Sequence, residues 1–493
     1  MTSFTRASGG PATIFSNIFR QSWLALAYRC SGAVVSLLFG VSFARMMNIE
    51  EYGALMSLMT FALVASTIGL VGQQFRVLRE IPSIAARKSY PEIGGIVAKR
   101  VRVACLGSAS VTVISLLLFV AAHGRDGIFG SWQYATSVLL ILPLALIEMQ
   151  SSLGRALGSV NLALVSKDVL WRFLIILLGG VLFMTYGHPL PAADVLVIAT
   201  GILIVLIVAQ NVYLRHLAQG CKVFTMAVRR SNDRIADFLS TSGPFWVTSV
   251  TSVICGTVDL VIVSVMVGPE AGGYYYAASR IALLLDFFLA TFCIPAAPLI
   301  ARLFDEKRDA EITRVTSGAS LAAFVAVLGC TVALALAGDI ALMAFGEAFT
   351  RAYSVLMVLA IGMLVSTYFG IGPIALNMTG HQRAAMNIVV ITWTVGILAM
   401  IGATWAFGTL GAAVAGACAG IATRAWTAAY IYAAQGIDIT ATTTLRALVR
   451  RTMRRGTSEP RTEAMRPEAG GTVLDLQRIR GRRNTTYKNR GDS

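Results

Sequence analysis

Long stretches of apolar residues alternate with short polar segments along most of the chain. Twelve stretches are long enough to span a membrane, because a bilayer core of about 30 Å needs about 20 residues of α-helix. Segments of alternating polarity, which are typical of membrane β-barrels, do not occur in the sequence. The pattern predicts an all-α polytopic membrane protein with twelve transmembrane helices, near residues 22–44, 54–73, 103–123, 133–150, 170–186, 191–214, 240–267, 274–301, 316–337, 353–373, 387–406 and 409–435.

The composition agrees with this pattern and argues against an enzyme. Only 13% of the 493 residues are charged, whereas a soluble domain carries about a quarter. The seven cysteines and four histidines show no spacing typical of a metal or redox site, and no phosphate-binding Walker A loop is found. No cleavable signal peptide is recognised, so we expect the first helix to be retained. The sequence predicts no cofactor.

The basic residues sort to one side of the predicted membrane. Lys and Arg accumulate on cytoplasmic loops, and with the amino terminus inside, 35 of them fall on inside segments. Only Arg45, Arg125 and Arg351 fall on outside loops. This bias predicts that both chain ends are cytoplasmic.

Three basic residues, Arg29, Arg280 and Arg424, fall within predicted spans. A central arginine costs about 2.5–3.5 kcal/mol on insertion scales and therefore tends to face a bundle interior or an aqueous cavity. We predict that the three form a cationic, substrate-binding pocket. Arg29 and Arg280 lie near span ends, so an alternative is that they snorkel to an interface. Arg424, near the middle of the last span, has less access to water.

Two acidic residues, Asp259 and Asp286, lie within the predicted seventh and eighth spans. Buried carboxylates of this kind either neutralise an arginine or take part in a proton or ion pathway. The sequence leaves both interpretations open, with charge pairing the simpler of the two.

Two landmarks indicate an internal repeat. Residues 50–53, Glu-Glu-Tyr-Gly, align with residues 270–273, Glu-Ala-Gly-Gly, at an offset of 220, and Gly158 aligns with Gly380 at an offset of 222. Each landmark precedes the same helix of its half, and six spans per half make the repeats parallel. We expect the glycines to permit tight turns and the neighbouring Tyr274–Tyr276 to lie in an interfacial aromatic belt.

The repeat and the charge pattern together predict the division of the chain. The link between the lobes is basic, which suggests a surface helix against anionic membrane lipids. From Thr443 onward the chain carries thirteen basic and five acidic residues, and lipid contact or disorder explains this composition better than nucleic-acid binding. The predicted parts are a cytoplasmic segment (1–21), an N-lobe (22–214), a cytoplasmic linker (215–239), a C-lobe (240–436) and a largely disordered basic cytoplasmic tail (437–493).

The order of several short motifs resembles the polysaccharide-unit flippases of the multidrug/oligosaccharidyl-lipid/polysaccharide (MOP) exporter superfamily. Both acidic glycine turns are similar to the turn that precedes the second helix of each lobe in that family. Residues 377–383, Asn-Met-Thr-Gly-His-Gln-Arg, and 407–413, Phe-Gly-Thr-Leu-Gly-Ala-Ala, resemble two later connections. The resemblance covers roughly residues 15–436, and the first lobe departs from it at Tyr52–Leu55 and Gly154–Leu157.

The resemblance implies two six-helix bundles around a central cavity in the bacterial inner membrane. Its implied activity is the flipping of undecaprenyl-diphosphate-linked oligosaccharide repeat units by alternating access, for O-antigen or exopolysaccharide biosynthesis. The implied partners are the lipid-linked oligosaccharide and, as candidates, a polysaccharide polymerase or other export machinery. Two alternatives stay open: a cation-coupled drug or metabolite antiporter on the same scaffold, and a membrane assembly factor that transports nothing.

Overall fold

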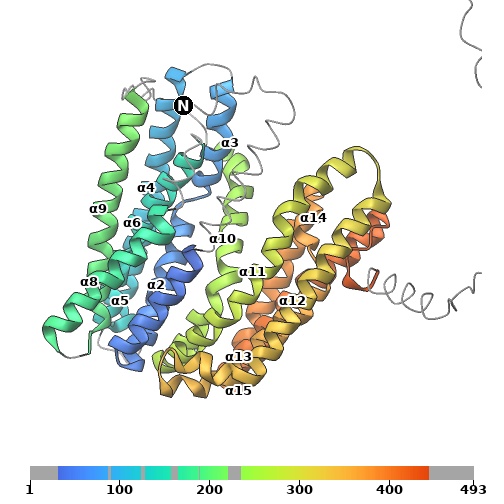
Figure 1. Cartoon of the computed structure of the whole chain (residues 1–493). Helices are drawn as coiled ribbons and strands as arrows, with labels where there is room; N and C mark the ends of the chain where they lie inside the picture. The colour runs from blue at the N-terminus through green and yellow to red at the C-terminus, as the bar shows by residue number, and fades with distance from the viewer. Residues whose placement is uncertain are drawn as a thin grey trace, which may run out of the picture. The chain divides into compact units, whose positions relative to one another are not determined.

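A computed structural model of the chain describes residues 31–86, 90–123, 128–156, 165–187, 189–219 and 235–443. This part of the chain is built of helices and contains no strand, as the apolar pattern predicts (Figure 1). A helical segment, Ser31–Met46, comes first. The elements that follow are α2 (Ile49–Gly69), α3 (Gln73–Ala86), α4 (Tyr90–Ala122), η1 (Ile128–Gly130), α5 (Trp132–Val138), α6 (Ile141–Ala156), η2 (Val165–Leu170), α8 (Trp171–Tyr186), α9 (Ala192–Gln219), α10 (Ile235–Met266), α11 (Pro269–Asp305), α12 (Asp309–Met343), η3 (Glu347–Ala352), α13 (Tyr353–Tyr368), α14 (Gly372–Met378) and α15 (Gln382–Gln435).

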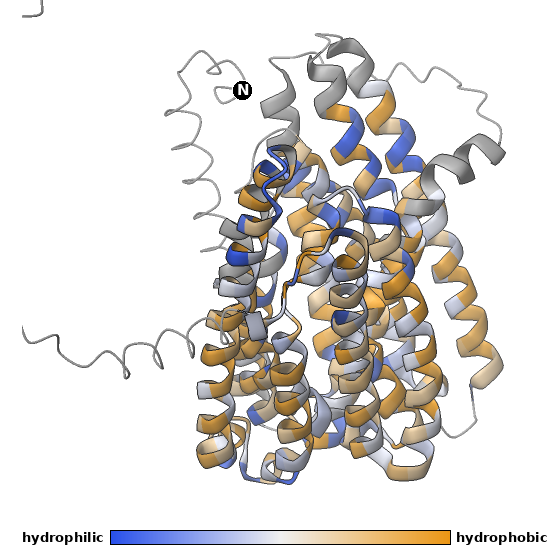
Figure 2. Cartoon of the chain, turned by 90° about the vertical axis from the view of Figure 1, so that its right-hand side faces the viewer, coloured by the Kyte–Doolittle hydropathy of each residue, from blue (hydrophilic) through white to orange (hydrophobic). Residues whose placement is uncertain are grey.

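Eight helical stretches in the described part of the chain are long and apolar enough to cross a membrane, and two shorter apolar helices accompany them. Hydrophilic residues gather toward the upper ends of the helices in Figure 2, and hydrophobic residues cover most of their length below. All-α polytopic architecture is therefore confirmed. The total of twelve crossings stays a prediction.

Helix α2 lies at the centre of the bundle. In the most apolar stretch of α2, 72% of the residues are buried inside the protein, whereas 17% are buried in the corresponding stretch of α4. It contacts α4, α5, α6 and α9 of the amino-terminal half and α10 and α11 of the carboxy-terminal half. Glu51 in its first turn accepts a hydrogen bond of 2.7 Å from the backbone N–H of Ala192, the first residue of α9. An acidic side chain is favourable at this position because the first N–H groups of a helix lack partners within it.

Gly53 and Gly273, the aligned glycines of the first landmark, meet where α2 crosses α11. A Cβ atom on Gly53 would lie 1.7 Å from the carbonyl oxygen of Pro269, and one on Gly273 would lie 3.3 Å from the Cα of Gly53. Small residues let helix backbones approach this closely. Gly53 and Gly273 lie inside α2 and α11, near their first residues, so the tight turns predicted for these two glycines are wrong, and they instead form a close contact between the two halves.

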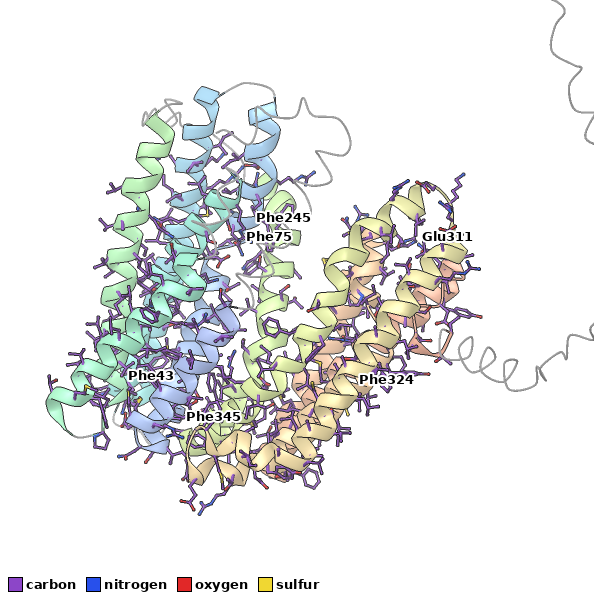
Figure 3. The ribbon with its side chains drawn as sticks, in the orientation of Figure 1. Phe43, Phe75, Phe245, Glu311, Phe324 and Phe345 are labelled. Atoms are coloured by element: carbon purple, nitrogen blue, oxygen red, sulfur yellow. The ribbon has the colours of Figure 1, made fainter. Side chains whose placement is uncertain are left out.

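Aromatic side chains surround this crossing. Tyr52 packs edge-on against Tyr276, with ring centroids 6.0 Å apart, and against Phe349 at 5.5 Å. Figure 3 shows Phe345 near the same lower end of the helices. We call this the glycine end of the molecule, and the end that carries α3 and the loop at 306–308 the basic end. The aromatic belt predicted for Tyr274–Tyr276 is wrong for two of the three tyrosines, because Tyr275 and Tyr276 are 0% and 5% exposed.

The 54-residue helix α15 is a helical hairpin. Gly408 interrupts it with φ 61° and ψ −140°, a conformation that favours glycine. Thr392 and Thr423 share a hydrogen bond of 2.8 Å between their hydroxyls, and a Cβ on Gly396 would lie 2.6 Å from the Cβ of Ala419. Both pairs are centred between residues 407 and 408, as antiparallel arms that turn at Gly408 require. The arms coincide with the predicted spans 387–406 and 409–435.

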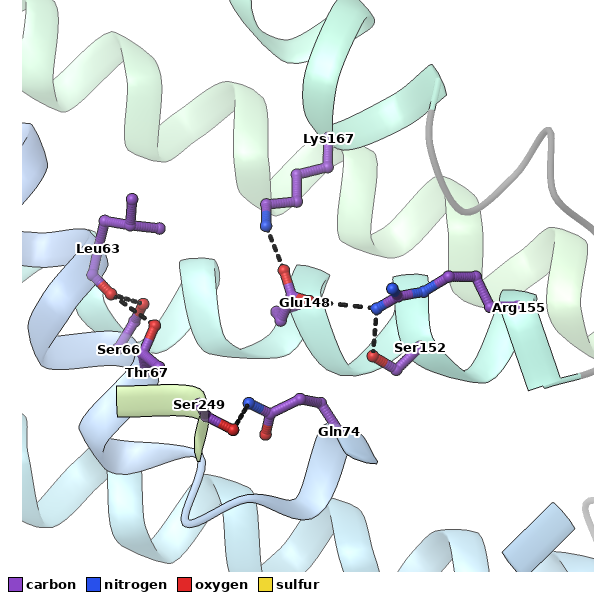
Figure 4. Close-up of polar contacts among 9 residues, drawn as sticks. All are labelled: Leu63, Ser66, Thr67, Gln74, Glu148, Ser152, Arg155, Lys167 and Ser249. Carbon is purple, nitrogen blue, oxygen red and sulfur yellow. Dashed lines mark hydrogen bonds and ion pairs between the residues drawn. The ribbon is translucent and has the colours of Figure 1, made fainter. Parts of the chain in front are cut away.

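At the basic end, polar contacts join α10 to the amino-terminal half (Figure 4). Gln74 of α3 donates a hydrogen bond of 2.9 Å to the hydroxyl of Ser249. Gly72, with φ 70°, allows the turn between α2 and α3, and a Cβ there would lie 2.6 Å from the backbone nitrogen of Trp246. The predicted second span, 54–73, thus ends in a sharp turn rather than running on into a loop.

A second polar group lies within the amino-terminal half. Glu148 of α6 forms ion pairs with Lys167 and, at 3.4 Å, with Arg155 (Figure 4). The sequence prediction placed both basic residues on an inside loop but did not identify their acidic partner. A count of charges along the sequence does not reveal this pair, because Glu148 is a single acidic residue within the predicted apolar span 133–150.

The predicted domain boundaries fall partly outside the described residues. The structure does not describe residues 220–234 of the linker, residues 444–493 of the tail or Gly158 of the second landmark. Residues 437–443 pack against the helices: Ile437 and Ile439 are each 1% exposed, and the carbonyl of Ile439 accepts a hydrogen bond of 2.8 Å from Ser320. The boundaries themselves stay predictions.

Candidate substrate-binding chamber

A cavity of ≈ 290 Å³ lies among α10, α11, α13 and α15, with Thr60 of α2 on its wall. We call it the chamber. It is lined by Arg280, Asp259, Asp286 and Arg424, which are four of the five residues singled out from the sequence. The fifth, Arg29, lies outside the described residues.

Arg424, on the second arm of α15, forms an ion pair with Asp286 of α11. The Nη2 to Oδ1 distance is 3.1 Å, and the side chains are 18% and 47% exposed. The other terminal nitrogen of Arg424, Nη1, is buried and has no hydrogen-bond partner within the described part of the chain. The guanidinium therefore has donor capacity that Asp286 does not use.

Arg280 points toward the chamber from α11 and packs on an aromatic ring. Its Cζ lies 4.5 Å from the ring centroid of Tyr276, one helical turn earlier. This geometry is a cation–π contact, which stabilises a guanidinium without neutralising its charge. The Nε of Arg280 is buried without a hydrogen-bond partner, and no carboxylate of the described residues forms an ion pair with this side chain.

Asp259 of α10 is held by neutral donors. The hydroxyl of Tyr275 donates to Oδ2 at 2.9 Å, and the backbone N–H of Leu260 donates to Oδ1 at 2.9 Å. These neutral donors satisfy the carboxyl oxygens without forming an ion pair. Of the two acids, only Asp286 shows the arginine pairing considered from the sequence.

Glycines form part of the chamber wall. A Cβ on Gly256 or Gly420 would meet no atom within 4 Å, whereas one on Gly362 would lie 2.5 Å from the Cβ of Ala417. The first two positions keep the chamber open, and the third allows α13 and α15 to pack closely. The helices thus approach one another on one side of the cavity and leave space on the other.

Two tyrosines also take part in the site. Tyr275 and Tyr276, expected at a membrane interface, contact Asp259 and Arg280 instead. The spacing of Tyr276 and Arg280, four residues apart on one helix, was a signal that could have linked them. Within the described residues no group of three or more His, Cys, Asp or Glu is placed to hold a metal ion.

Helices of this arrangement occur in solved membrane transporters. An inward-facing multidrug resistance MATE family transporter of the MOP superfamily matches with a TM-score of 0.63 at 14% identity, over 87% of this chain and 96% of the transporter. The lipid II flippase MurJ in an inward closed conformation matches with a TM-score of 0.63 at 15% identity, over 83% and 87%. A MOP superfamily transporter from Pyrococcus furiosus, described as having a binding pocket of reverse polarity, matches with a TM-score of 0.52 at 14% identity, over 84% and 93%.

The chain therefore shares the fold of these MOP superfamily transporters. The model of the family described as "Polysaccharide biosynthesis protein" matches residues 19–304. This is more than half of the 493 residues, and the chain belongs to that family. The resemblance predicted from the motifs is confirmed. A search of curated protein sequences finds no match.

Proposed function

We propose that this protein flips undecaprenyl-diphosphate-linked oligosaccharide repeat units from the inner to the outer leaflet of the bacterial inner membrane, with both chain ends in the cytoplasm. The observation that carries the proposal is the chamber with two arginines, each holding a buried N–H donor that has no partner within the described residues. A diphosphate is anionic and rich in acceptors, so it matches such donors. Arginine also binds phosphate through two parallel, charge-assisted hydrogen bonds.

The ion pair between Arg424 and Asp286 suits a reversible binding site. Asp286 is about half exposed, and an ion pair in contact with water contributes only about 0–1 kcal/mol. A diphosphate that replaces this carboxylate gains charge-assisted hydrogen bonds of about 1.5–3 kcal/mol each. Asp286 can return to Arg424 when the substrate leaves, so the Arg424 guanidinium has an anionic partner at every stage.

Alternating access requires the contacts between the two halves to break in turn at the two ends of the molecule. At the glycine end, the two halves are in close contact through Gly53, Gly273 and the aromatic side chains around them. Arg45 adds a hydrogen bond of 2.8 Å to the carbonyl of Ala344, the C-cap of α12.

The polyprenyl tail can stay in the lipid while the headgroup enters, because hydrocarbon gains nothing by leaving the bilayer.

Substitution of Arg424 tests the proposal. Arg424→Ala should abolish surface polysaccharide in cells that depend on this protein, with the amount of protein in the membrane unchanged. Arg424→Lys keeps the charge but not the two-pronged geometry, so it should restore export only partly. Export at the normal level by Arg424→Ala would refute the role of the chamber.

Asp286→Ala is the matched control. If Arg424 served only to neutralise Asp286, loss of either partner would have the same effect on export. A substrate-binding role predicts that Asp286→Ala keeps most of the export activity, because the arginine that binds diphosphate is still present. Equal loss in both variants would point to a structural ion pair.

A second candidate function is a cation-coupled drug or metabolite antiporter. Asp259 favours it, because this carboxylate lines the chamber and is held by Tyr275 and a backbone N–H rather than by an arginine. Intramembrane carboxylates of this kind mark proton and cation pathways. Efflux of the cationic dye ethidium from vesicles, lost in Asp259→Asn, would support this function, and its absence in the wild type would exclude it for that class of substrate. A non-transporting assembly factor is disfavoured by the open chamber.

A further inference from the structure

A larger cavity, of ≈ 590 Å³, lies nearer the basic end. Phe75 of α3 and Phe245 of α10 form one wall, stacked with their ring centroids 6.4 Å apart, and Figure 3 labels the two next to each other. The facing wall comes from α14 and α15 and carries three amide side chains, Asn377, Gln382 and Asn387. We call this cavity the amide pocket.

The three amides are chemically available. Asn377, Gln382 and Asn387 are exposed, and within the described residues none of them makes a side-chain hydrogen bond. Each amide offers two donors and one acceptor oxygen. A single cationic residue, Arg383, lines the pocket with them. Neutral groups that both donate and accept match a ligand rich in hydroxyls better than they match an anion.

The amide pocket adjoins the chamber along two helices. On α10, Thr251 and Ser252 line the amide pocket, and Cys255 and Gly256 line the chamber. This step is about one helical turn, roughly 5 Å. On α15, Val390 lines the amide pocket and Trp393 lines the chamber in the same way. A headgroup whose diphosphate occupies the chamber would place the sugar attached to it in the amide pocket.

From this placement we propose that the amide pocket binds the first sugars of the lipid-linked oligosaccharide, while the chamber binds its diphosphate. The inference rests on the proposed function and deepens it. The volume lies within the range of about 300–1,000 Å³ found for ligand pockets, which combine aromatic walls with a few polar groups. Phe75 and Phe245 supply the apolar surface for the C–H face of a sugar ring, and the amides receive its hydroxyls.

Binding to three probes tests the inference on the purified full-length protein in lipid nanodiscs. The probes are undecaprenyl diphosphate, and the same lipid carrying one N-acetylglucosamine or one galactose residue. The wild type should bind at least one sugar-bearing probe about five- to tenfold more tightly than the bare lipid, since each hydrogen bond contributes about fivefold. If neither sugar improves binding, the inference is overturned.

The double variant Asn377→Ala with Asn387→Ala should lose this preference and keep its affinity for undecaprenyl diphosphate. Thr394→Val is the matched control, because Thr394 is an exposed polar residue two turns beyond Asn387 on α15 and lines neither cavity. It should keep the preference. A preference that survives in the double variant overturns the inference.

Failure of the proposed function gives a different result. Arg424→Ala should weaken binding of all three probes by a similar factor, because it removes a contact to the diphosphate that they share. If Arg424→Ala leaves the affinities unchanged, the chamber is not the diphosphate site. The double variant then still decides whether the amide pocket recognises sugar.

Discussion

Substitution of Gly420 by leucine should block the chamber without destabilising the protein. Gly420 lies four residues before Arg424, on the same face of α15, and lines the chamber. A Cβ at this position would meet no atom within 4 Å. The new side chain should therefore occupy empty space instead of displacing a neighbour.

The size of the effect follows from the volumes. Taking about 30 Å³ for each added carbon, the volume of one water molecule in the liquid, leucine adds about 120 Å³. The chamber holds ≈ 290 Å³, so the diphosphate loses roughly 40% of its space. Loss of one charge-assisted hydrogen bond, about 1.5–3 kcal/mol, would weaken binding by about 10- to 150-fold. Helix propensity acts in the opposite direction, because leucine is more favourable than glycine within a helix by about 0.8 kcal/mol.

Two measurements separate blocking from unfolding: export of surface polysaccharide in cells, and the thermal unfolding temperature of the purified protein. Gly420→Leu should lower export at least tenfold with an unchanged or higher unfolding temperature. Gly402→Leu is the matched control, since Gly402 also lies on α15 with no atom within 4 Å of a Cβ and lines neither cavity. Normal export by Gly420→Leu would refute the assignment of the chamber to transport.

Two further predictions concern the contact between the halves and the ion pair. Gly53→Ala should lower the stability of the protein by about 1–3 kcal/mol, because the added Cβ would lie 1.7 Å from the carbonyl oxygen of Pro269. Thermal unfolding of the purified protein measures this loss. Gly201→Ala is the control and should lose no stability, since a Cβ there meets nothing within 4 Å. Asp286→Asn should tighten binding of undecaprenyl diphosphate, since Arg424 loses its competing carboxylate; an unchanged dissociation constant in a direct binding measurement would contradict the exchange of partners.

The predicted helices agree with the structure because their cause is local. A run of about 20 apolar residues must satisfy its backbone hydrogen bonds internally when it lies in a membrane, and helix is the form that does so within a single segment. The two arms of α15 and the break at Gly408 follow from the same local rule. An apolar run does not predict the turn at Val71, which has φ 48° beside Gly72. This turn lies against α10, since a Cβ on Gly72 would lie 2.6 Å from the backbone nitrogen of Trp246.

The tyrosines show why residue type alone did not place every side chain. Tyrosine suits a membrane interface, and it also suits a buried contact in which its hydroxyl finds a partner. The sequence offers no sign of which role applies to Tyr275. Its hydroxyl donates to Asp259, a residue of the preceding helix, and only the packing of α10 against α11 brings the two together.

The sequence by itself determined which stretches are helical, and that Arg280, Arg424 and two aspartates lie at costly positions within apolar segments. Each of these follows from the price of placing a polar group in hydrocarbon, which depends on the segment alone. The tertiary structure decided that these side chains share one chamber, although Asp286 and Arg424 are 138 residues apart. It also decided that the repeated glycines touch, because such contacts depend on how helices pack rather than on the order of their residues.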